Sequence, residues 1–406
     1  MNILYIDHYA GSPDMGMEFR PYYLAREWIK MGHQVTIVAG DYSHLRTENR
    51  TLKKEFQKEI LDGICYCWVK TGTYEGNGVR RAFTMFRFVG KLWMNARRIA
   101  EVMKPDVVIT SSTYPLDTYA GQRIAKISGA KLIHEVHDMW PITPIEINGM
   151  SRYHPFIVVL QLAENSFCRK SDYVVSLLPN ADEYLMVHGM EREKFVTIPN
   201  GIVLEEWKEK EDLPDEAGRL MSCIREKHKF ILCFFGSHTK SYALEYLIEA
   251  VKSFSYEELG LVFVGNGNDK ERLKELSQDY RNIYFLDPVP KKCIPSLVET
   301  VDGIYVGAAN NRMFRFGICM NKLFDAMMSG KPILYAVNAP NNFIKEFGCG
   351  ISVKAEDAEA LKKGIKELLD KTEEERQYMG EKGRKAVLEY FNYEKLAERF
   401  IEVFKR

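Results

Sequence analysis

Apolar runs rich in β-branched and aromatic residues alternate along the whole chain with longer amphipathic segments. The runs predict buried strands, and the amphipathic segments, with apolar positions three and four residues apart, predict helices that cover them. Such alternation is typical of parallel sheets with helices on both faces. The sequence therefore predicts an α/β fold. The expected strands are residues 2–6, 34–40, 106–110, 131–136, 172–177, 194–199, 229–236, 260–265, 283–287, 303–307, 332–337 and 350–353.

The pattern occurs twice, which predicts two domains. A chain of 406 residues also exceeds the roughly 250 to 300 residues that one hydrophobic core supports. Residues 205–228 are charged and lack strand character, so we expect them to link a domain of residues 1–204 to a second domain of residues 229–386. Each domain is expected to be a doubly wound, Rossmann-like parallel sheet.

Composition excludes several classes of protein. Basic and acidic residues number 56 each, so no global field attracts nucleic acid. The eight cysteines form no CxxC pair, which excludes a zinc ribbon and a thioredoxin motif. No apolar run reaches the roughly 18 residues that a membrane span needs, and the start of the chain looks like a first strand rather than a signal peptide. We therefore expect a cytoplasmic protein.

Glycine-bearing loops follow the first strand of each half, at residues 8–20 and 236–241, and a helix follows each loop. Backbone N–H groups and the positive end of a helix dipole meet at such a place and favour anions. Neither loop has the GxGxxG spacing of dinucleotide-binding enzymes. An anionic ligand other than a dinucleotide is the better expectation.

The order of three segments, residues 260–276, 282–308 and 322–337, resembles the nucleotide-sugar half of the retaining glycosyltransferases of family 4. The first half agrees with that family at residues 32–40, 133–141 and 196–207. Within the family, residues 11–21 and 317–327 resemble the branch that builds bacterial O-antigen and capsule polysaccharides from amino- and deoxysugars. The resemblance implies the GT-B fold, in which two Rossmann-like domains face each other across a cleft. It also implies that the last helix, residues 387–406, crosses back to the first domain.

The resemblance assigns donor-binding residues to the second half. Residues 318–322 would cradle the diphosphate, Asp325 would bind the ribose, and Lys240 and Lys322 would supply positive charge to the departing phosphate. The family pattern has two glutamates eight positions apart, and here Gly317 and Asp325 stand in their places, which leaves the transferred sugar open. UDP is expected from the family branch. The donor-binding positions implied are Gly16, Ser237, Gly265, Val289, Gly317, Ile318, Cys319, Met320, Asn321 and Asp325.

In the first half, His137 follows a predicted strand, and the resemblance places it near the reacting end of the donor sugar. Asp138 would orient His137, contact the acceptor or cap the next helix. Glu18 and Arg20 lie at the entry of the first helix and are expected to contact the acceptor, although a solvated first helical turn explains both nearly as well. We expect His134 to be a core residue.

No DxD motif occurs, and histidines and carboxylates do not cluster at metal-ligand spacing, so no metal or other cofactor is expected. No residue stands out as an enzymatic nucleophile, which suits front-face transfer with retention. Residues 79–98 carry six basic residues and no acid, interleaved with Phe83, Phe86, Phe88, Leu92 and Trp93, a pattern typical of an interfacial helix. The partners expected are a UDP-sugar, a lipid-linked saccharide acceptor and the inner face of the cytoplasmic membrane. A helix that packs on its own domain explains the stretch almost as well.

Three alternatives remain open: a UDP-sugar 2-epimerase, a transferase with a soluble sugar-phosphate acceptor, and a GT-B scaffold without activity. The epimerase would need carboxylates near the donor sugar, where the chain has Gly317. The scaffold would leave the joint presence of Lys240, Lys322 and Asp325 unexplained.

Overall fold

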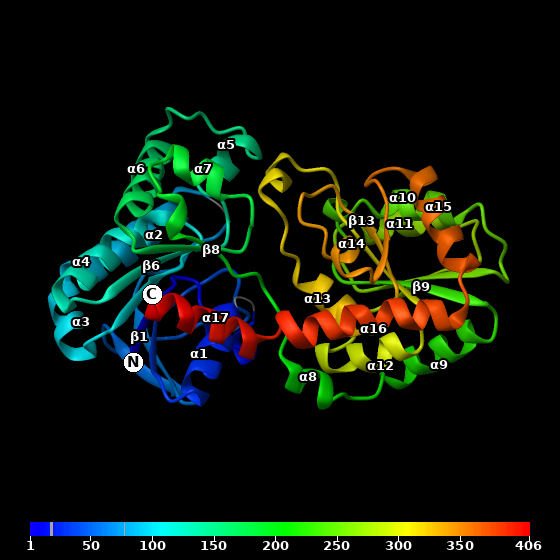
Figure 1. Ribbon diagram of the computed structural model, residues 1–406, viewed down its shortest axis with the longest axis horizontal. Helices are drawn as coiled ribbons and strands as arrows, with labels where there is room; N and C mark the ends of the chain where they lie inside the picture. Colours follow the sequence, from blue (N-terminus) through cyan, green and yellow to red (C-terminus); the bar gives the residue numbers. More distant parts are fainter. Residues whose placement is uncertain (17–18, 77) are drawn as a thin grey trace. The chain divides into compact units, whose positions relative to one another are not determined.

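The computed structural model describes residues 1–16, 19–76 and 78–406, which form two compact units. Unit 1 comprises Met1–Asn200 and Tyr393–Arg406, and unit 2 comprises Gly201–Asn392 (Figure 1). Each unit is a largely parallel sheet with helices on both faces, so the predicted α/β architecture is confirmed.

The sheet of unit 1 has eight strands in the order β3-β4-β2-β1-β5-β6-β7-β8, and all neighbours are parallel except β3 and β4. The β3–β4 hairpin was not predicted. Its turn is Asp62-Gly63, with φ of 49° and 81°, which is a common sequence for a tight hairpin because both positions need positive φ. The strands are β1 (Asn2–Ile6), β2 (Gln34–Gly40), β3 (Gln57–Leu61), β4 (Ile64–Val69), β5 (Val107–Thr110), β6 (Lys131–Val136), β7 (Tyr173–Ser176) and β8 (Phe195–Thr197).

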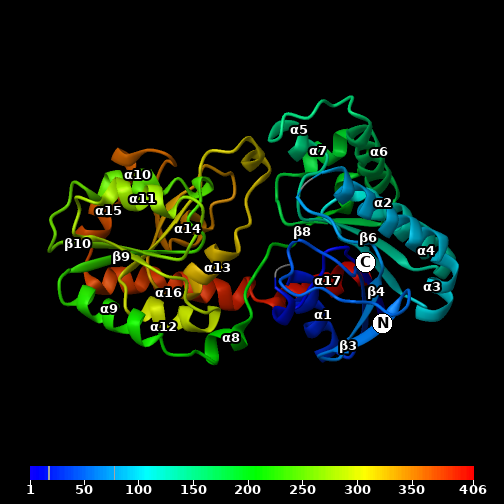
Figure 2. The same cartoon turned by 180° about the vertical axis from the view of Figure 1, so that it is seen from behind.

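One face of this sheet is covered by a layer that includes α2, α3, α4 and α6, and the other by α1 and α17 (Figure 1, Figure 2). The helices are α1 (Arg20–Lys30), α2 (Val79–Met94), α3 (Ala96–Met103), α4 (Thr118–Ser128), α5 (Ile142–Glu146), α6 (Pro155–Lys170), α7 (Asp182–Val187) and α17 (Tyr393–Lys405). Short 3-10 turns lie at Pro13–Met15, Pro115–Asp117 and Arg192–Lys194.

The sheet of unit 2 has six parallel strands in the order β11-β10-β9-β12-β13-β14. The chain runs from β9 outward to β11 and then returns to place β12 on the other side of β9, so the strand order reverses between β9 and β12. Open α/β sheets bind ligands beyond the carboxyl ends of the strands at such a point. The strands are β9 (Phe230–Phe235), β10 (Leu259–Val264), β11 (Ile283–Leu286), β12 (Gly303–Gly307), β13 (Ile333–Ala336) and β14 (Gly350–Ser352).

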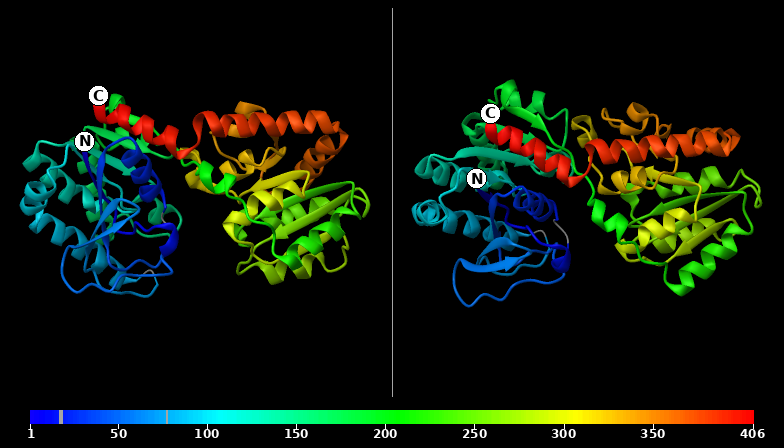
Figure 3. Two further views of the ribbon diagram at one scale, coloured as in Figure 1. Left: turned by 90° about the horizontal axis from the view of Figure 1, so that it is seen from below. Right: turned by 60° about the horizontal axis from the view of Figure 1, so that its bottom comes forward.

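Helices cover both faces of the sheet of unit 2 (Figure 3). One apolar cluster joins the sheet to α9, α12, α13, α14 and α16, and another joins it to α10, α11 and α15. The helices are α8 (Leu204–Lys208), α9 (Asp215–Arg225), α10 (Leu244–Val251), α11 (Lys270–Ser277), α12 (Ile294–Glu299), α13 (Asn321–Met328), α14 (Phe343–Phe347), α15 (Ala358–Asp370) and α16 (Glu373–Tyr390). Short 3-10 turns lie at Lys240–Tyr242, Lys291–Cys293 and Arg312–Phe316.

The expected linker, residues 205–228, is part of unit 2 rather than a separate connection. Met221 and Ile224 of α9 are buried in the same core cluster as α13, and Trp207 of α8 packs against that cluster. The charged residues that suggested a linker lie on α8, on α9 and in the loops next to them, and most of them are exposed. Charge density alone therefore did not distinguish an exposed helix face from a linker.

Helix α17 returns to unit 1 and packs beside α1 (Figure 1). Trp28 of α1 has no solvent exposure. Its ring centroid lies 5.5 Å from that of Phe400 and 5.4 Å from that of Phe404, and its Nε1 donates a hydrogen bond of 3.2 Å to the Ala397 carbonyl. The last helix is therefore a part of the core of unit 1.

Replacing Trp28 by Ala is expected to lower the free energy of unfolding of unit 1 by about 3 to 5 kcal/mol, because it removes a fully buried indole. The matched control, Trp93→Ala, removes an indole that is 49% exposed and should cost less than about 1 kcal/mol. Urea unfolding of both variants measures the difference. Equal losses would show that α17 does not anchor on Trp28.

Candidate functional site

The carboxyl ends of β1, β5 and β6 hold a buried polar network in unit 1. Glu135, the fifth residue of β6, has no solvent exposure. Its carboxylate accepts hydrogen bonds from Ser111 at 2.6 Å and from His137 Nε2 at 3.0 Å, and also from the Tyr5 hydroxyl. Ser111 Oγ lies 2.8 Å from the same His137 nitrogen. The network fixes the position of the His137 ring at the edge of the sheet.

Arg20 completes this network from α1. Its Nε donates to Glu135 at 2.9 Å, and its terminal nitrogens donate to the carbonyls of Pro199 and Ile198 and to the Asn200 side chain. Burial alone would raise the pKa of Glu135, but the Arg20 guanidinium and His137 outweigh burial and hold that pKa well below its ordinary value. The carboxylate is therefore ionised in the folded protein.

We expected Arg20 to contact the acceptor, but its buried position beside Glu135 does not agree with that expectation. Arg20 is 4% exposed, and the structure uses its guanidinium to neutralise Glu135 and to fasten the chain around residues 198–200. The sequence placed Arg20 correctly at a helix start, but the side chain of an N-terminal helical residue can turn inward as well as outward. Glu18 lies outside the described residues.

Gly16 has a φ of 96°, which favours glycine, and a Cβ there would lie 2.9 Å from the backbone nitrogen of Thr47. A neighbouring loop of unit 1 therefore already accounts for this glycine. Asp138 is exposed, and the N-cap of α5 is Pro141. The expectation that Asp138 caps that helix is therefore wrong. Glu135 and Ser111 provide the hydrogen bonds that position His137, and the sequence did not identify them.

His134 lies in the core, as expected. Its ring stacks on Phe167 with centroids 3.8 Å apart, its Nδ1 lies 2.7 Å from the Thr110 hydroxyl, and burial lowers its pKa to about 3. It stays neutral at physiological pH.

In unit 2, Lys322 lies in the first turn of α13, beside the carboxyl end of β9. Its ammonium nitrogen is 3.3 Å from the ring centroid of Tyr242 and 4.4 Å from that of Phe234. Gly236 approaches so closely that a Cβ there would lie 2.7 Å from this nitrogen. The buried nitrogen has no hydrogen-bond partner among the described residues, and burial lowers the pKa of Lys322 from 10.5 to about 7.

Two glycine loops meet beside Lys322. A Cβ on Gly265, after β10, would lie 2.0 Å from the carbonyl oxygen of Gly236, after β9, so only glycine fits there. His238 is fully buried below these loops, and neither ring nitrogen has a hydrogen-bond partner among the described residues. Burial, together with Lys270 and Lys322, lowers the pKa of His238 to about 4. This neutral imidazole was not identified from the sequence.

The loop before α13 offers fewer free backbone N–H groups to a ligand than the sequence predicted. Asn341 accepts a hydrogen bond from the Ile318 N–H at 2.8 Å and donates one to the Ile318 carbonyl at 2.7 Å. The Ile318 N–H is thus already satisfied, and the expectation that it holds phosphate does not agree with this contact. The N–H groups of Asn321 and Lys322 lie in the first turn, where a helix provides no acceptor for them. Gly317 ends the preceding 3-10 turn with a φ of 106°.

The other predicted donor-binding residues lie in or near α13 and in the loops after β9 and β11. Asp325 accepts a hydrogen bond of 3.3 Å from Trp207 Nε1, and burial raises its pKa. Val289 packs against the core in the loop after β11. Ser237 and Lys240 are exposed. Cys319 and Met320 are half-buried between Gly317 and α13.

Within the described residues, no three histidine, cysteine or acidic side chains come together in a way that could hold a metal ion. None of the helices that the structure describes combines the length and the apolar character needed to cross a bilayer. Unit 2 thus presents a buried, unpaired ammonium group, free N–H groups at a helix start and close-packed glycine loops. These features favour an anionic ligand such as a phosphate.

The comparisons with known proteins agree with this geometry. Residues 15–206 match the family described as Glycosyltransferase Family 4, and residues 224–386 match Glycosyl transferases group 1. The chain is a glycosyltransferase of the GT-B fold. The two matches follow the two units and cover both carboxyl edges described above.

Three similar proteins illustrate the range of relatives. The uncharacterized glycosyltransferase MJ1069 of Methanocaldococcus jannaschii is 26% identical over 309 residues, which are 74% of this chain and 75% of that protein. The putative colanic acid biosynthesis glycosyl transferase WcaI of Escherichia coli is 25% identical over 280 residues, 66% of this chain and 67% of that protein. The structure of Anabaena Alr3699/HepE in complex with UDP and glucose superposes with a TM-score of 0.65 at 15% identity, covering 100% of this chain and 99% of that one.

A diphosphate bound at α13 is expected to reprotonate Lys322. With a pKa of about 7, Lys322 is mostly neutral at pH 8 in the free protein, and two phosphate charges beside it would favour the ammonium form. UDP binding at pH 8 should therefore take up close to one proton. His238, with a pKa of about 4, stays neutral and contributes nothing at this pH. Calorimetry in Hepes and in Tris, which differ in ionisation enthalpy, measures the uptake.

The control is Lys322→Met, which keeps the length of the side chain and should abolish proton uptake. Uptake that persists in the variant would place the titrating group elsewhere. In the free protein, stability should rise with pH between about 7 and 10.5, because Lys322 is then protonated only in the unfolded chain.

Proposed function

We propose that this glycosyltransferase moves a sugar, with retention at the anomeric carbon, from a UDP-sugar to a lipid-linked or saccharide acceptor in bacterial surface polysaccharide synthesis. The observation that supports it most is the Lys322 side-chain nitrogen, buried between two aromatic rings with no hydrogen-bond partner in the described parts of the chain. Burial disfavours its charged form, so an anion that binds beside it would favour protonation. The diphosphate of a nucleotide sugar supplies such an anion.

The described residues suggest a division of roles. Lys322 and the first turn of α13 stabilise the charge that develops on the departing diphosphate, and exposed Lys240 adds a second positive charge. Asp325 binds the ribose. His137, held by Glu135 and Ser111, contacts the donor sugar, and the departing phosphate takes the acceptor proton. These charged groups perform the task that a divalent cation performs in other transferases.

Two similarities support the choice of substrates. The Escherichia coli relative is named as a putative colanic acid biosynthesis glycosyl transferase, and the Anabaena structure holds UDP and glucose. The N-acetylated amino or deoxy sugar that we propose rests on the resemblance of residues 317–327 to the O-antigen and capsule branch.

The surface of unit 1 supports a lipid-linked acceptor. Helices α2, α4 and α6 carry several basic residues, and their one acid, Glu164, is 1% exposed. The same helices expose large apolar side chains. These are Val79, Phe83, Phe86, Trp93, Met94, Ile127, Val158 and Leu162. These three helices present basic and apolar side chains and no exposed acid of their own, which suits an anionic bilayer, so we propose peripheral association with the inner face of the cytoplasmic membrane.

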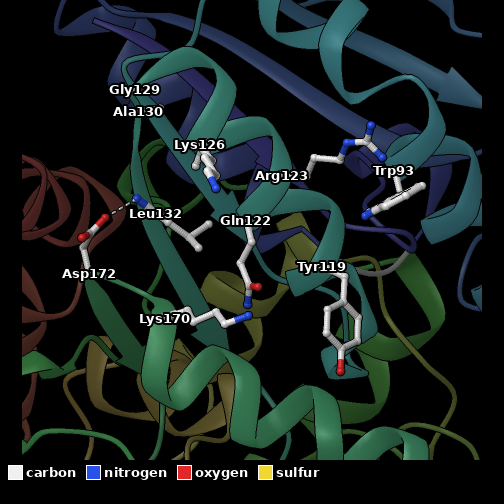
Figure 4. A pocket seen from close by; sticks show the side chains of 11 residues that line it. Trp93, Tyr119, Gln122, Arg123, Lys126, Gly129, Ala130, Leu132, Lys170 and Asp172 are labelled. Carbon is white, nitrogen blue, oxygen red and sulfur yellow. Dashed lines mark hydrogen bonds between the residues drawn. The ribbon is translucent and has the colours of Figure 1, made fainter.

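A hollow of about 810 Å³ lies on this surface at the C-terminal end of α4. Figure 4 shows Arg123, Lys126 and Lys170 around it. The Arg123 guanidinium lies 3.8 Å from the Trp93 ring centroid, and the Asp172 carboxylate accepts a hydrogen bond from the Leu132 N–H at 2.7 Å. The hollow therefore presents mainly positive charge and suits a lipid phosphate.

Thermal shift with a panel of UDP- and GDP-sugars tests the donor assignment. A UDP-sugar at 100 times its Kd should stabilise the protein by roughly 2.7 kcal/mol, and the shift should persist in excess EDTA. Lys322→Met should reduce it, whereas Lys345→Met, in α14, should not. A shift that needs Mg²⁺ or Mn²⁺, or one produced by GDP-sugars alone, would contradict the assignment.

Sedimentation with anionic vesicles tests the membrane surface. Replacing Arg123, Lys126 and Lys170 by Gln should weaken binding, since each basic residue near an anionic surface is worth about 1 kcal/mol. The matched control replaces Lys362, Lys363 and Lys366 of α15 in unit 2 by Gln. Binding should also fall at high salt. Equal sedimentation of the two variants would show that this surface does not bind lipid.

A further inference from the structure

Unit 1 has an apolar groove between the N-terminal half of α2, α5 and the start of α6. Its volume is about 620 Å³, within the range of roughly 300 to 1,000 Å³ that is typical of small-molecule sites. Its floor belongs to a buried cluster that includes Tyr9, Met85 and Tyr114. The walls are formed mainly by Phe83, Phe86, Trp140, Met150, Phe156 and Val159.

The charges around the groove have one sign. None of the described lining residues is acidic, and the basic residue Arg81 is among them. Phe83 is 65% exposed and Phe86 is 44% exposed, so the apolar wall continues onto the lipid-facing surface of α2. A ligand with a hydrocarbon portion and an anionic end complements these features.

The groove leads to the carboxyl edge of the sheet that holds His137. Arg81 Nε donates a hydrogen bond of 3.3 Å to the Tyr9 hydroxyl, and its guanidinium carbon lies 5.4 Å from the Tyr9 ring centroid. Tyr9 follows β1, and Trp140 follows His137 by three residues. One end of the groove therefore lies near the candidate site, and the other meets the exposed aromatic surface.

We propose that this groove binds the hydrocarbon chain of a lipid-phosphate acceptor, with Arg81 beside the phosphate. The inference rests on the lipid-linked acceptor of the proposed function and gives that acceptor a place on unit 1. The continuity of the apolar wall with the lipid-facing surface favours a lipid chain over a peptide, and the absence of acidic lining residues favours an anionic end.

Dodecyl phosphate and butyl phosphate are suitable probes, and their binding is measured by calorimetry below the critical micelle concentration without donor. Dodecyl phosphate should bind at least about tenfold more tightly, because burying each further methylene group is favourable. A dodecyl phosphate with a diazirine near the chain end should label α2, α5 or α6 on irradiation, as read by mass spectrometry. Equal affinities, or labels spread over both units, would overturn the proposal.

Three variants locate the ligand. Ala82→Trp fills the groove and should weaken dodecyl phosphate binding by about tenfold or more, whereas Met94→Trp, at a 69% exposed position of the same helix, should not. Arg81→Gln should weaken dodecyl phosphate but not neutral dodecyl maltoside. Equal effects of the two tryptophan variants, or loss of both ligands in Arg81→Gln, would contradict the assignment.

The photolabelling arm needs no variant, so a misfolded Ala82→Trp would leave the test intact. A dimer that Ala82→Trp dissociates in sedimentation velocity would reassign the groove to contact between copies. Binding of dodecyl phosphate without any binding of UDP-sugars would disprove the donor site but would still support the lipid assignment of the groove. Binding of UDP-sugars without any binding of dodecyl phosphate would disprove only the lipid assignment of the groove.

Discussion

The side-chain nitrogen of Lys322, buried with no hydrogen-bond partner among the described residues, is the constraint on which the site in unit 2 depends. Lys322 could reach solvent from an ordinary helix start, but Tyr242, Phe234 and Gly236 enclose its nitrogen. The cost appears as a pKa lowered to about 7, since burial disfavours the charged form. An anion beside this nitrogen would favour its charged form again, which agrees with the phosphate ligand proposed above.

In unit 1, by contrast, a buried charge is fully paired with neighbouring side chains. Glu135 is equally inaccessible, but Arg20, Ser111 and His137 satisfy it completely enough to keep it ionised. A fully paired buried network has little to gain from a ligand, and breaking it is costly. We therefore interpret this network as the support that positions His137, whereas the Lys322 nitrogen has no hydrogen-bond partner among the described residues.

The fold was predictable from local pattern, but the site was predictable only in part. Buried parallel strands are continuous apolar runs, so each expected strand was visible in the sequence. The β3–β4 hairpin was not predicted. Its strand β3 lies at the sheet edge and alternates in burial, whereas β4 is an interior apolar run like the strands that were expected. The Asp62-Gly63 turn was the available signal for the hairpin. Lys322 and Asp325 were found by resemblance. The resemblance could not show that Asn341, 23 residues further along, occupies the Ile318 N–H, or that Arg20 turns inward to Glu135, because both contacts join distant parts of the chain.

The central claim is that Lys322 recognises the diphosphate rather than the nucleoside. Calorimetric affinities of the protein for uridine, UMP and UDP test it most directly, since the three ligands differ only in phosphate. The account predicts that affinity rises steeply from uridine to UDP and that Lys322→Met removes most of this rise while leaving uridine binding unchanged. The same rise in the variant as in the parent protein would contradict the account.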